Sequence, residues 1–192
     1  RKVGKMFVDI CFPNDNEEEF IDVANQLGTS DLIFLYKTKN SIKKINENQK
    51  LNIWTATYDK ISPQTLFFDK SLNTNYIKKK KVIYYFEGPF LNKKNFHFPM
   101  KDLNHVFVKE IANNNRFFGI SISYFINSNK NDDFEKLTLF MSLANKYNVK
   151  LFVSSFAKKP YDLQSKKSIN NFTKSFGISN KLHYLNKVNL TL

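Results

Sequence analysis

The chain has 192 residues, 42% of them hydrophobic, which is enough for one compact domain with a well-filled core. Its net charge of +13 favours a polyanionic partner, and no apolar run approaches the roughly 18 residues of a membrane-spanning helix. The lone Cys11 excludes an internal disulfide and a cysteine-built zinc site; together with the absence of a secretory signal, it predicts a cytoplasmic protein.

The charge is unevenly distributed along the chain. Residues 1–35 carry a net charge of −4, whereas residues 70–109 carry +7. The chain is rich in Asn, Lys and Ile and has only two Arg, as expected if an AT-rich genome biases residue usage, and such a bias could supply about half of the positive excess. The uneven map favours a basic binding face over a uniform drift in composition.

Short apolar runs alternate with helical patterns in the first half of the chain. Residues 6–10 (MFVDI) predict a buried strand, and Asn14 followed by Glu17 predicts a capped helix that ends at Gly28. A second strand is predicted at residues 32–36 (LIFLY). The remaining elements of this half are a short capped helix at 41–45, strands at 51–57 and 82–86, and an ambiguous apolar piece at 66–68.

The second half continues the alternation. Helices are predicted at residues 102–114, 132–147 and 165–176, the last ended by Gly177. The longest of them has an inner stripe made of Phe134, Leu137, Met141 and Ala144. Strands are predicted at 117–123 and 149–154, and a last short strand or strap before residue 188.

Apolar strands separated by helices are typical of parallel sheets, because crossover helices bury both faces of each strand. The sequence therefore predicts an α/β domain with a parallel sheet, either open or closed into a barrel. A full eight-stranded barrel needs trimmed helices and loops at this chain length.

Catalytic motifs are missing from the sequence. The three histidines, His97, His105 and His183, have no ligand spacing between them, and Asp9 with Glu87 makes only a weak metal site at the strand ends. Neither a glycine-rich phosphate loop nor a G-x-S-x-G elbow occurs. Cys11 follows a strand without a histidine partner, so we expect a buried, inert thiol.

His105 is the histidine with the clearest surface position. It shares one face of its predicted helix with Lys109 and Asn113, opposite the apolar face. One interpretation makes His105 and Lys109 contacts to RNA or to a protein partner; the other makes His105 a surface residue near the helix start. The sequence leaves both open.

Lysines cluster where the predicted strands end. If the sheet is parallel, one set projects from the carboxyl-end face, and a second pair begins the last helix near the same rim. A phosphate contact needs only positive charge and reach, so these side chains are predicted to bind RNA. The first set is Lys37, Lys93, Lys94, Lys158 and Lys159, and the second is Lys166 and Lys167.

Four stretches carry a family resemblance. They are VDICFP, LGTSDLIFLYK, LNHVFVKEIANNNRFFGISIS and VKLFVSSFAKKPYDLQSKKSINNFTKSFGIS, in this order along the chain. Over them the chain resembles the protein component 3 family of archaeal ribonuclease P, whose eukaryotic relative is the thirty-kilodalton subunit. The chain departs from the family's pattern at Gln164, where Arg is common, and at Phe156 and Phe176, where smaller or aliphatic residues are usual.

The resemblance implies a single-domain TIM-barrel-like fold over residues 1–192, related to polymerase-and-histidinol-phosphatase (PHP-like) domains but without their metal histidines. It also implies a noncatalytic subunit. The RNA of such an enzyme removes the 5′ leader of precursor tRNA with its own Mg²⁺, while the protein pairs with a small RRM-like, ferredoxin-fold subunit. No cofactor on this chain itself is implied.

Two rival interpretations stay open at this stage. The first is a metal-dependent phosphoesterase of the same PHP-like barrel superfamily, which stoichiometric metal with turnover would reveal. The second is a generic basic scaffold protein, which would not select the ribonuclease P RNA over other RNAs.

Overall fold

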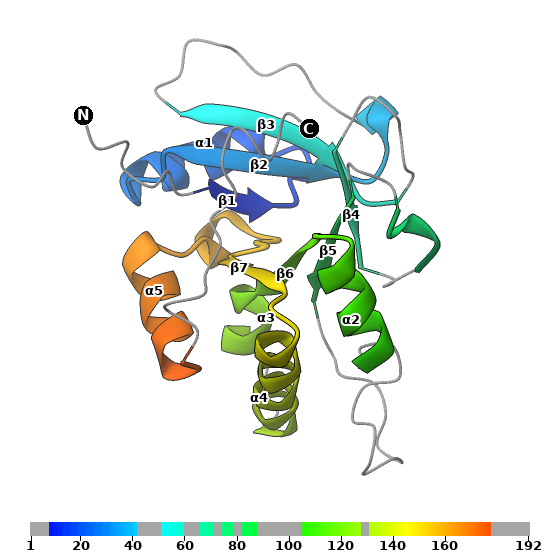
Figure 1. Ribbon diagram of the computed structural model, residues 1–192. Helices are drawn as coiled ribbons and strands as arrows, with labels where there is room; N and C mark the ends of the chain where they lie inside the picture. The colour runs from blue at the N-terminus through cyan, green and yellow to red at the C-terminus, as the bar shows by residue number, and fades with distance from the viewer. Residues whose placement is uncertain are drawn as a thin grey trace, which may run out of the picture.

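In the part of the chain that the structure describes, seven parallel strands form one sheet in which each strand pairs with the next along the chain (Figure 1). The computed structural model describes residues 8–41, 51–59, 66–70, 74–78, 82–87, 105–127 and 131–177, without the side chains of residues 131 and 132. The strands are β1 (Val8–Cys11), β2 (Asp31–Tyr36), β3 (Asn52–Thr57), β4 (Leu66–Asp69), β5 (Val82–Phe86), β6 (Phe117–Ser121) and β7 (Lys150–Ser154).

The sheet closes on itself just beyond β7. Cys11 forms a parallel bridge with Ala157. The Phe12 amide donates to the Ala157 carbonyl at 2.8 Å, and the Ala157 amide donates to the Ile10 carbonyl at 3.0 Å. The predicted parallel β/α barrel is therefore confirmed, and the described residues contribute seven strands to it. The assignment of the whole chain to a single domain stays a prediction.

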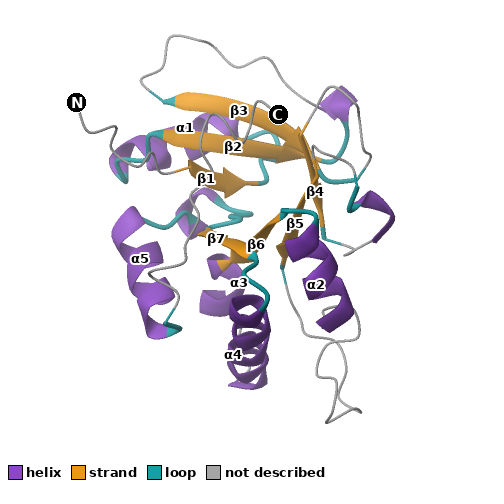
Figure 2. Ribbon diagram, viewed as in Figure 1, coloured by secondary structure: helices purple, strands orange, loops and turns teal. Residues whose placement is uncertain are grey.

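Helices cover the outside of the barrel unevenly. Figures 1 and 2 show α1 beside β1 and β2, and the other α-helices around β5, β6 and β7. The α-helices are α1 (Glu17–Gln26), α2 (His105–Asn113), α3 (Ile122–Asn127), α4 (Asn131–Lys146) and α5 (Lys166–Ser175). Three short 3-10 turns also occur, η1 (Lys39–Ser41), η2 (Thr74–Tyr76) and η3 (Pro160–Asp162). None of the helices in the described ranges combines the length and the apolar character that crossing a bilayer requires.

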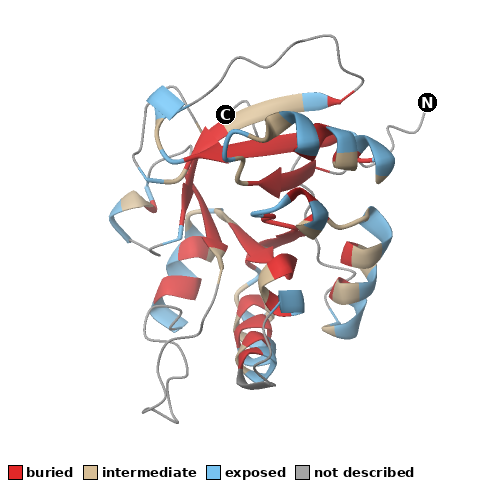
Figure 3. Ribbon diagram, turned by 180° about the vertical axis from the view of Figure 1, so that it is seen from behind, coloured by how far each residue is buried: buried red, intermediate tan, exposed pale blue. Residues whose placement is uncertain are grey.

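The buried residues divide into the barrel interior and two outer layers. Ile10, Leu35 and Tyr85 belong to the interior cluster, which alternate residues of the strands supply. The intervening residues face outward, those of β1 and β2 against α1 and those of β4 to β7 against the other helices. Figure 3 shows the strands other than β3 as the most buried part of the molecule.

Most predicted elements are present with small shifts of their ends. Gly28 and Gly177 follow α1 and α5 with φ angles of 69° and 67°, the left-handed conformation that ends helices. The ambiguous piece at 66–68 is strand β4, and β5 has its predicted bounds. Cys11 is buried, and burial raises the pKa of its thiol well above the ordinary value, as expected of an inert cysteine.

Three predictions in the second half and at the first helix were wrong in detail. The strand predicted at 117–123 stops at Ser121, because residues 122–127 form α3. The cap of α1 is Asn16 rather than Asn14, and its side chain makes no cap hydrogen bond. In α4 the stripe residue Phe134 is 37% exposed, and Phe140 is the buried aromatic residue instead.

Four predicted segments lie wholly or partly outside the described residues: the first residues of the 6–10 strand, most of the 41–45 helix, residues 102–104 and the last strand before residue 188. Ser41, at the edge of the predicted 41–45 helix, belongs to the 3-10 turn η1.

Candidate functional site

The carboxyl ends of the strands converge on one opening of the barrel. Alternation places the residue that follows each of β1 to β5 in phase with the inward-facing positions of that strand. These residues are Phe12, Lys37, Tyr58, Lys70 and Glu87. The sequence thus delivers a ring of polar and aromatic side chains to the end of a parallel barrel at which ligand sites form.

These five residues line a pocket of about 480 Å³, which we call the mouth pocket. The volume lies within the range of roughly 300–1,000 Å³ that small-molecule sites occupy. The remaining lining residues come from the loop after β1, from β2, η1 and β5, and from the segment after β7: Pro13, Asn14, Asp15, Glu17, Leu35, Tyr36, Ser41, Tyr85 and Lys158.

Charges of both signs meet in the mouth pocket. Lys158 forms an ion pair with Glu87, and Glu17 accepts a hydrogen bond of 3.1 Å from the Tyr36 hydroxyl. The ammonium of Lys70 lies 5.8 Å from the centre of the Tyr58 ring. The pocket therefore combines lysines, carboxylates and aromatic rings within one small volume.

Two aromatic rings form the floor beneath the pocket. Tyr85 and Phe156 stack at 4.8 Å with an interplanar angle of 5°, and both side chains are buried. The Tyr85 hydroxyl is buried and has no hydrogen-bond partner among the described residues. Burial raises the pKa of Tyr85 far above its ordinary value, and the charge of Glu87 raises it further. The phenol therefore keeps its proton and can only be satisfied by an added acceptor or donor.

The floor is held in a strained conformation. Phe156 has a φ angle of 48°, which is uncommon for a bulky residue and costs on the order of 1–3 kcal/mol. The ring has room because β6 carries Gly119 opposite it: a Cβ built there would lie 2.9 Å from Phe156 Cζ and 2.5 Å from Phe152 Cζ. Strain of this kind collects near functional sites more often than elsewhere.

Next to the floor, Asp9 fastens the closure of the barrel. Its carboxylate accepts hydrogen bonds from the Ser154 hydroxyl at 2.6 Å, the Ser155 amide at 2.7 Å and the Ser155 hydroxyl at 2.6 Å. The Gln164 amide in turn donates to the Ser155 hydroxyl at 2.8 Å. Burial raises the pKa of Asp9 although these bonds lower it. Every oxygen of this buried carboxylate is used in holding β1 to β7, so Asp9 is a structural residue.

Asp9 and Glu87, which the sequence allowed to meet at the strand ends, have different partners in the structure. The Asp9 carboxylate accepts hydrogen bonds from Ser154 and Ser155, whereas Glu87 lies in the mouth pocket and pairs with Lys158. Within the described ranges, no group of three or more His, Cys, Asp or Glu side chains is placed to hold a metal ion.

The structure brings only some of the predicted RNA-binding residues together. Lys37 and Lys158 both line the mouth pocket, and Lys159, the residue after Lys158, is exposed. His105 and Lys109 are exposed on α2, as the helical wheel predicted. Lys166 and Lys167 are exposed in the first turn of α5, whereas Lys93 and Lys94 lie outside the described residues.

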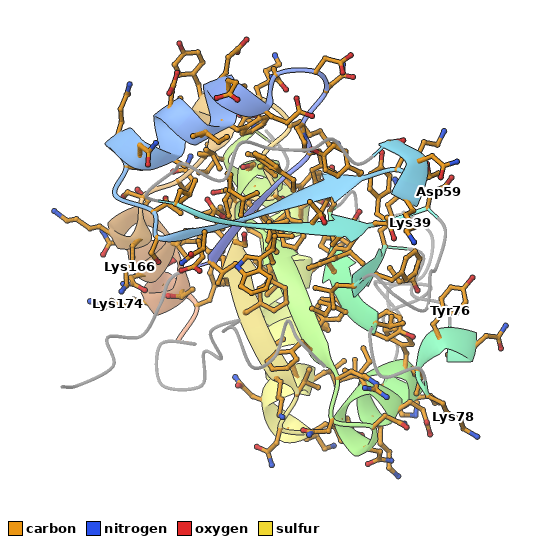
Figure 4. All side chains as sticks on the ribbon, turned by 90° about the horizontal axis from the view of Figure 1, so that it is seen from above. Lys39, Asp59, Tyr76, Lys78, Lys166 and Lys174 are labelled. Atoms are coloured by element: carbon orange, nitrogen blue, oxygen red, sulfur yellow. The ribbon has the colours of Figure 1, made fainter. Side chains whose placement is uncertain are left out.

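The lysines of α5 and those after β2 lie apart. Figure 4 shows Lys166 and Lys174 on the opposite side of the molecule from Lys39 and Asp59. The cations predicted to share one rim therefore form at least two separate groups, and RNA contact by either group stays a prediction.

Sequence reasoning missed several members of the site, among them Lys70 and Tyr85. Lys70 follows β4, which was too short and too ambiguous in the sequence to be assigned as a strand, so the Lys70 side chain was not predicted to lie at the mouth. Tyr85 was predicted only as part of an apolar strand. It forms the floor of the pocket because its side chain, like that of Ile83, points into the barrel. Alternate residues of a strand point to the same face, so counting back in steps of two from each strand end could have identified both as facing the barrel interior.

The excess positive charge of the chain lies outside the described residues. The described ranges contain fourteen of the thirty basic residues and fifteen of the seventeen acidic ones, a net charge of −1. The other residues therefore carry +14. The described part of the barrel does not by itself present the strongly basic character that the whole chain has.

Comparison with known proteins yields a similarity of fold. No protein-family model and no curated protein sequence matches the chain. Among solved structures, a chain of the "cryo-EM structure of archaeal Ribonuclease P with mature tRNA" aligns with a TM-score of 0.66 and 16% sequence identity. The alignment covers 91% of this chain and 86% of that chain. At this level of identity the likeness establishes a shared architecture.

Proposed function

We propose that this chain is a protein subunit of ribonuclease P that supports the catalytic RNA in removing the 5′ leader of precursor tRNA. The observation that carries the proposal is the fold likeness to a chain of an archaeal ribonuclease P structure over 91% of the sequence. Fold alone does not determine function, so the proposal also needs support from particular residues of this chain.

That support comes from where the four family-like stretches lie in the barrel. VDICFP contains β1, LGTSDLIFLYK contains β2, the third stretch contains α2 and β6, and the fourth contains β7 and α5. Because β7 closes onto β1, these strands form one continuous arc, β6–β7–β1–β2. Stretches chosen from sequence alone therefore mark one contiguous side of the barrel.

The proposed role is electrostatic and architectural. Lysines that neutralise phosphates release condensed counterions, which lets the RNA fold and keep its Mg²⁺ at lower salt. The chain would contact the ribonuclease P RNA, a small RRM-like protein subunit and, through the assembled enzyme, precursor tRNA in the cytoplasm. It would need no cofactor of its own, and the RNA would perform the cleavage.

Reconstitution tests the proposal directly. The chain is added to the cognate ribonuclease P RNA and the other subunits, and precursor tRNA cleavage is measured at limiting Mg²⁺. We expect faster cleavage and selective binding of this RNA over an unrelated RNA of equal length. An unchanged rate, or equal binding of both RNAs, would contradict the proposal. Stoichiometric Mn or Zn on the chain with phosphoesterase turnover would favour the rival enzyme.

Charge removal on the described surface provides a second test. The double substitution Lys158→Gln and Lys159→Gln should reduce the salt slope of RNA binding by about two, since each phosphate contact contributes about 0.9 to it. Lys174→Gln, in the last turn of α5 and on the side of the molecule away from Lys39 (Figure 4), is the matched control and should leave the slope unchanged. Equal slopes for all three proteins would rule out this part of the surface.

A further inference from the structure

We propose that the mouth pocket binds a ribonucleoside monophosphate, either free or as an unpaired nucleotide of an RNA strand. All the residues that line the pocket come from this chain, so binding of a free nucleotide does not depend on the proposed function. Binding of a nucleotide within an RNA strand does rest on it. Each part of such a ligand has a matching group in the pocket.

The phosphate matches the two lysines after β2 and β4. Lys37 and Lys70 both line the pocket, and neither ammonium has a carboxylate partner among the described residues. A third lysine, Lys158, is tied to Glu87 but remains 68% exposed. Two ammonium groups at the ends of β2 and β4, the strands on either side of β3, are suited to a dianion, which they hold as point charges.

The base matches the aromatic wall. Phe12 and Tyr58 meet edge to face with ring centres 5.4 Å apart, and both line the pocket. A planar base can stack on the face of such a ring without a sequence preference. Lys70, which already lies over the Tyr58 ring, links this wall to the phosphate side of the pocket.

The ribose matches the carboxylates. Asp15 and Glu17 line the pocket beside Phe12, and a carboxylate is a strong acceptor for ribose hydroxyls. Inorganic phosphate alone would gain nothing from these acidic groups and would be repelled by them. Their presence therefore favours a nucleotide over a bare anion, and a ribose over a deoxyribose.

The floor supplies an unmet hydrogen bond. The Tyr85 hydroxyl lies buried beneath the pocket without a partner among the described residues, a rare arrangement in folded proteins. A ligand oxygen at the base of the pocket would accept from it. The strained Phe156 stacked on Tyr85 fixes this hydroxyl in place.

Calorimetric titration of the full chain with AMP, GMP, CMP and UMP tests the inference. We expect saturable binding of ribonucleoside monophosphates, at least about tenfold tighter than inorganic phosphate and tighter than the deoxyribose analogue. To separate the two sources, a single-stranded oligoribonucleotide and a duplex of the same sequence compete with the nucleotide. Displacement by the single strand but not by the duplex identifies RNA as the source, and displacement by neither identifies a free nucleotide.

Three substitutions locate the site. Lys37→Gln and Lys70→Gln should each weaken nucleotide binding about tenfold, as expected for loss of a charge-assisted hydrogen bond. Tyr85→Phe removes only the hydroxyl and should weaken binding about fivefold while leaving the unfolding midpoint unchanged or higher. Lys174→Gln, which changes the charge equally in the last turn of α5, on the side of the molecule away from Lys39 (Figure 4), is the control and should bind as the parent does.

Several results would overturn the inference. They are binding that none of the three substitutions weakens, inorganic phosphate binding as tightly as AMP, equal competition by single strand and duplex, and no nucleotide binding at all. Cleavage by the reconstituted enzyme is measured separately with Tyr85→Phe. A chain that stimulates cleavage but binds no nucleotide contradicts this inference alone, whereas one that binds nucleotides but does not stimulate cleavage contradicts the proposed function alone.

Discussion

β7 and β3 show how differently two strands of one barrel can be built. β7 is buried at four of its five positions, its outer face packs against helices, and its end is fastened to β1 by Asp9. β3 is buried only at its last two positions, and Figure 3 shows most of it at intermediate or high exposure. The same parallel pairing therefore rests on many contacts on one side and few on the other.

The difference follows from the length of the connections. The link from β6 to β7 is long enough for both α3 and α4, whereas only eight residues separate Thr57 from Leu66. A crossover between parallel strands needs about a dozen residues or more to carry a helix. The short link leaves the outer face of β3 with little cover, and the stability of the barrel should be concentrated around β7.

The substitution Asp9→Ala should have the largest effect. It leaves three buried donors on Ser154 and Ser155 without an acceptor, so we expect a loss of about 4 kcal/mol in the free energy of unfolding. The matched control is Asp31→Ala on β2, because Asp31 is almost as buried but, among the described residues, its carboxylate accepts only a 3.2 Å bond from the exposed Asn52. It should lose about 1 kcal/mol in urea unfolding. Equal losses would remove the contrast between the two sides.

Asp9 also predicts a pH dependence. Its pKa is raised from the ordinary 3.8, so its contribution to stability is complete below pH 3.8 and is lost as the pH rises through the higher folded-state value. Asp9→Asn does not titrate. The stability advantage of the parent over Asp9→Asn should therefore shrink from about pH 4 upward, as measured by urea unfolding of both proteins at each pH. A difference that grows with pH would show that the carboxylate is stabilised rather than strained by burial.

A pair of truncations compares the outer faces. Leu151→Ala on β7 removes a residue that is 1% exposed, and we expect a loss of about 3 kcal/mol. Ile53→Ala on β3 removes a half-buried residue and should lose about 1 kcal/mol. Denaturant midpoints of the two variants, with similar slopes, give the comparison; a reversed order would mean that β3 is better covered than the described residues show.

The inner face of β6 allows a test in which a side chain is enlarged rather than truncated. Gly119→Ala inserts a methyl group against the rings of Phe152 and Phe156, and overpacking should destabilise the protein by about 2 kcal/mol. Adding Phe152→Leu should restore part of that loss, because it removes the nearer ring. Additive effects in the double mutant would show that the methyl group clashes with something else.

Trp54→Phe on β3 should have the smallest effect. The indole N–H of Trp54 is buried without a partner among the described residues, so its removal offsets the smaller packing area. We expect a change below about 1 kcal/mol, followed by far-ultraviolet circular dichroism because the variant lacks the only tryptophan. A loss comparable with that of Leu151→Ala would show that β3 carries more of the core than its exposure indicates.

Periodicity in the sequence was sufficient for most of the barrel. LIFLY and VIYYF are apolar at every position and are buried on both faces, so their assignment as parallel strands needed no tertiary information. The end of β6 was harder. Residues 117–123 are strand-like throughout, yet the chain turns into α3 after Ser121. At this turn the Ser123 amide donates to the carbonyl of Ser155, which follows the neighbouring strand β7.

The site was predictable in position but not in composition. A parallel sheet places its ligand groups at the carboxyl ends of the strands, and Lys37 and Lys158 were located there correctly. The pocket residues that were not predicted depend on which side chains of each strand point into the barrel, and on contacts between residues far apart in the sequence. The sequence shows Phe156 only as a departure from a family pattern, whereas its stacking on Tyr85 requires β5 and the end of β7 to meet in space.

The closure of the barrel has a consequence for how the chain folds. Asp9 meets the Ser155 hydroxyl across 146 residues of sequence, one of the longest loops that this chain can close. β1 and β2 are neighbours in sequence and can pair early, whereas the other edge of β1 must wait until nearly the whole barrel has been synthesised. During that interval β1 is an open sheet edge, so the nascent chain is most exposed to aggregation just before its last strand arrives.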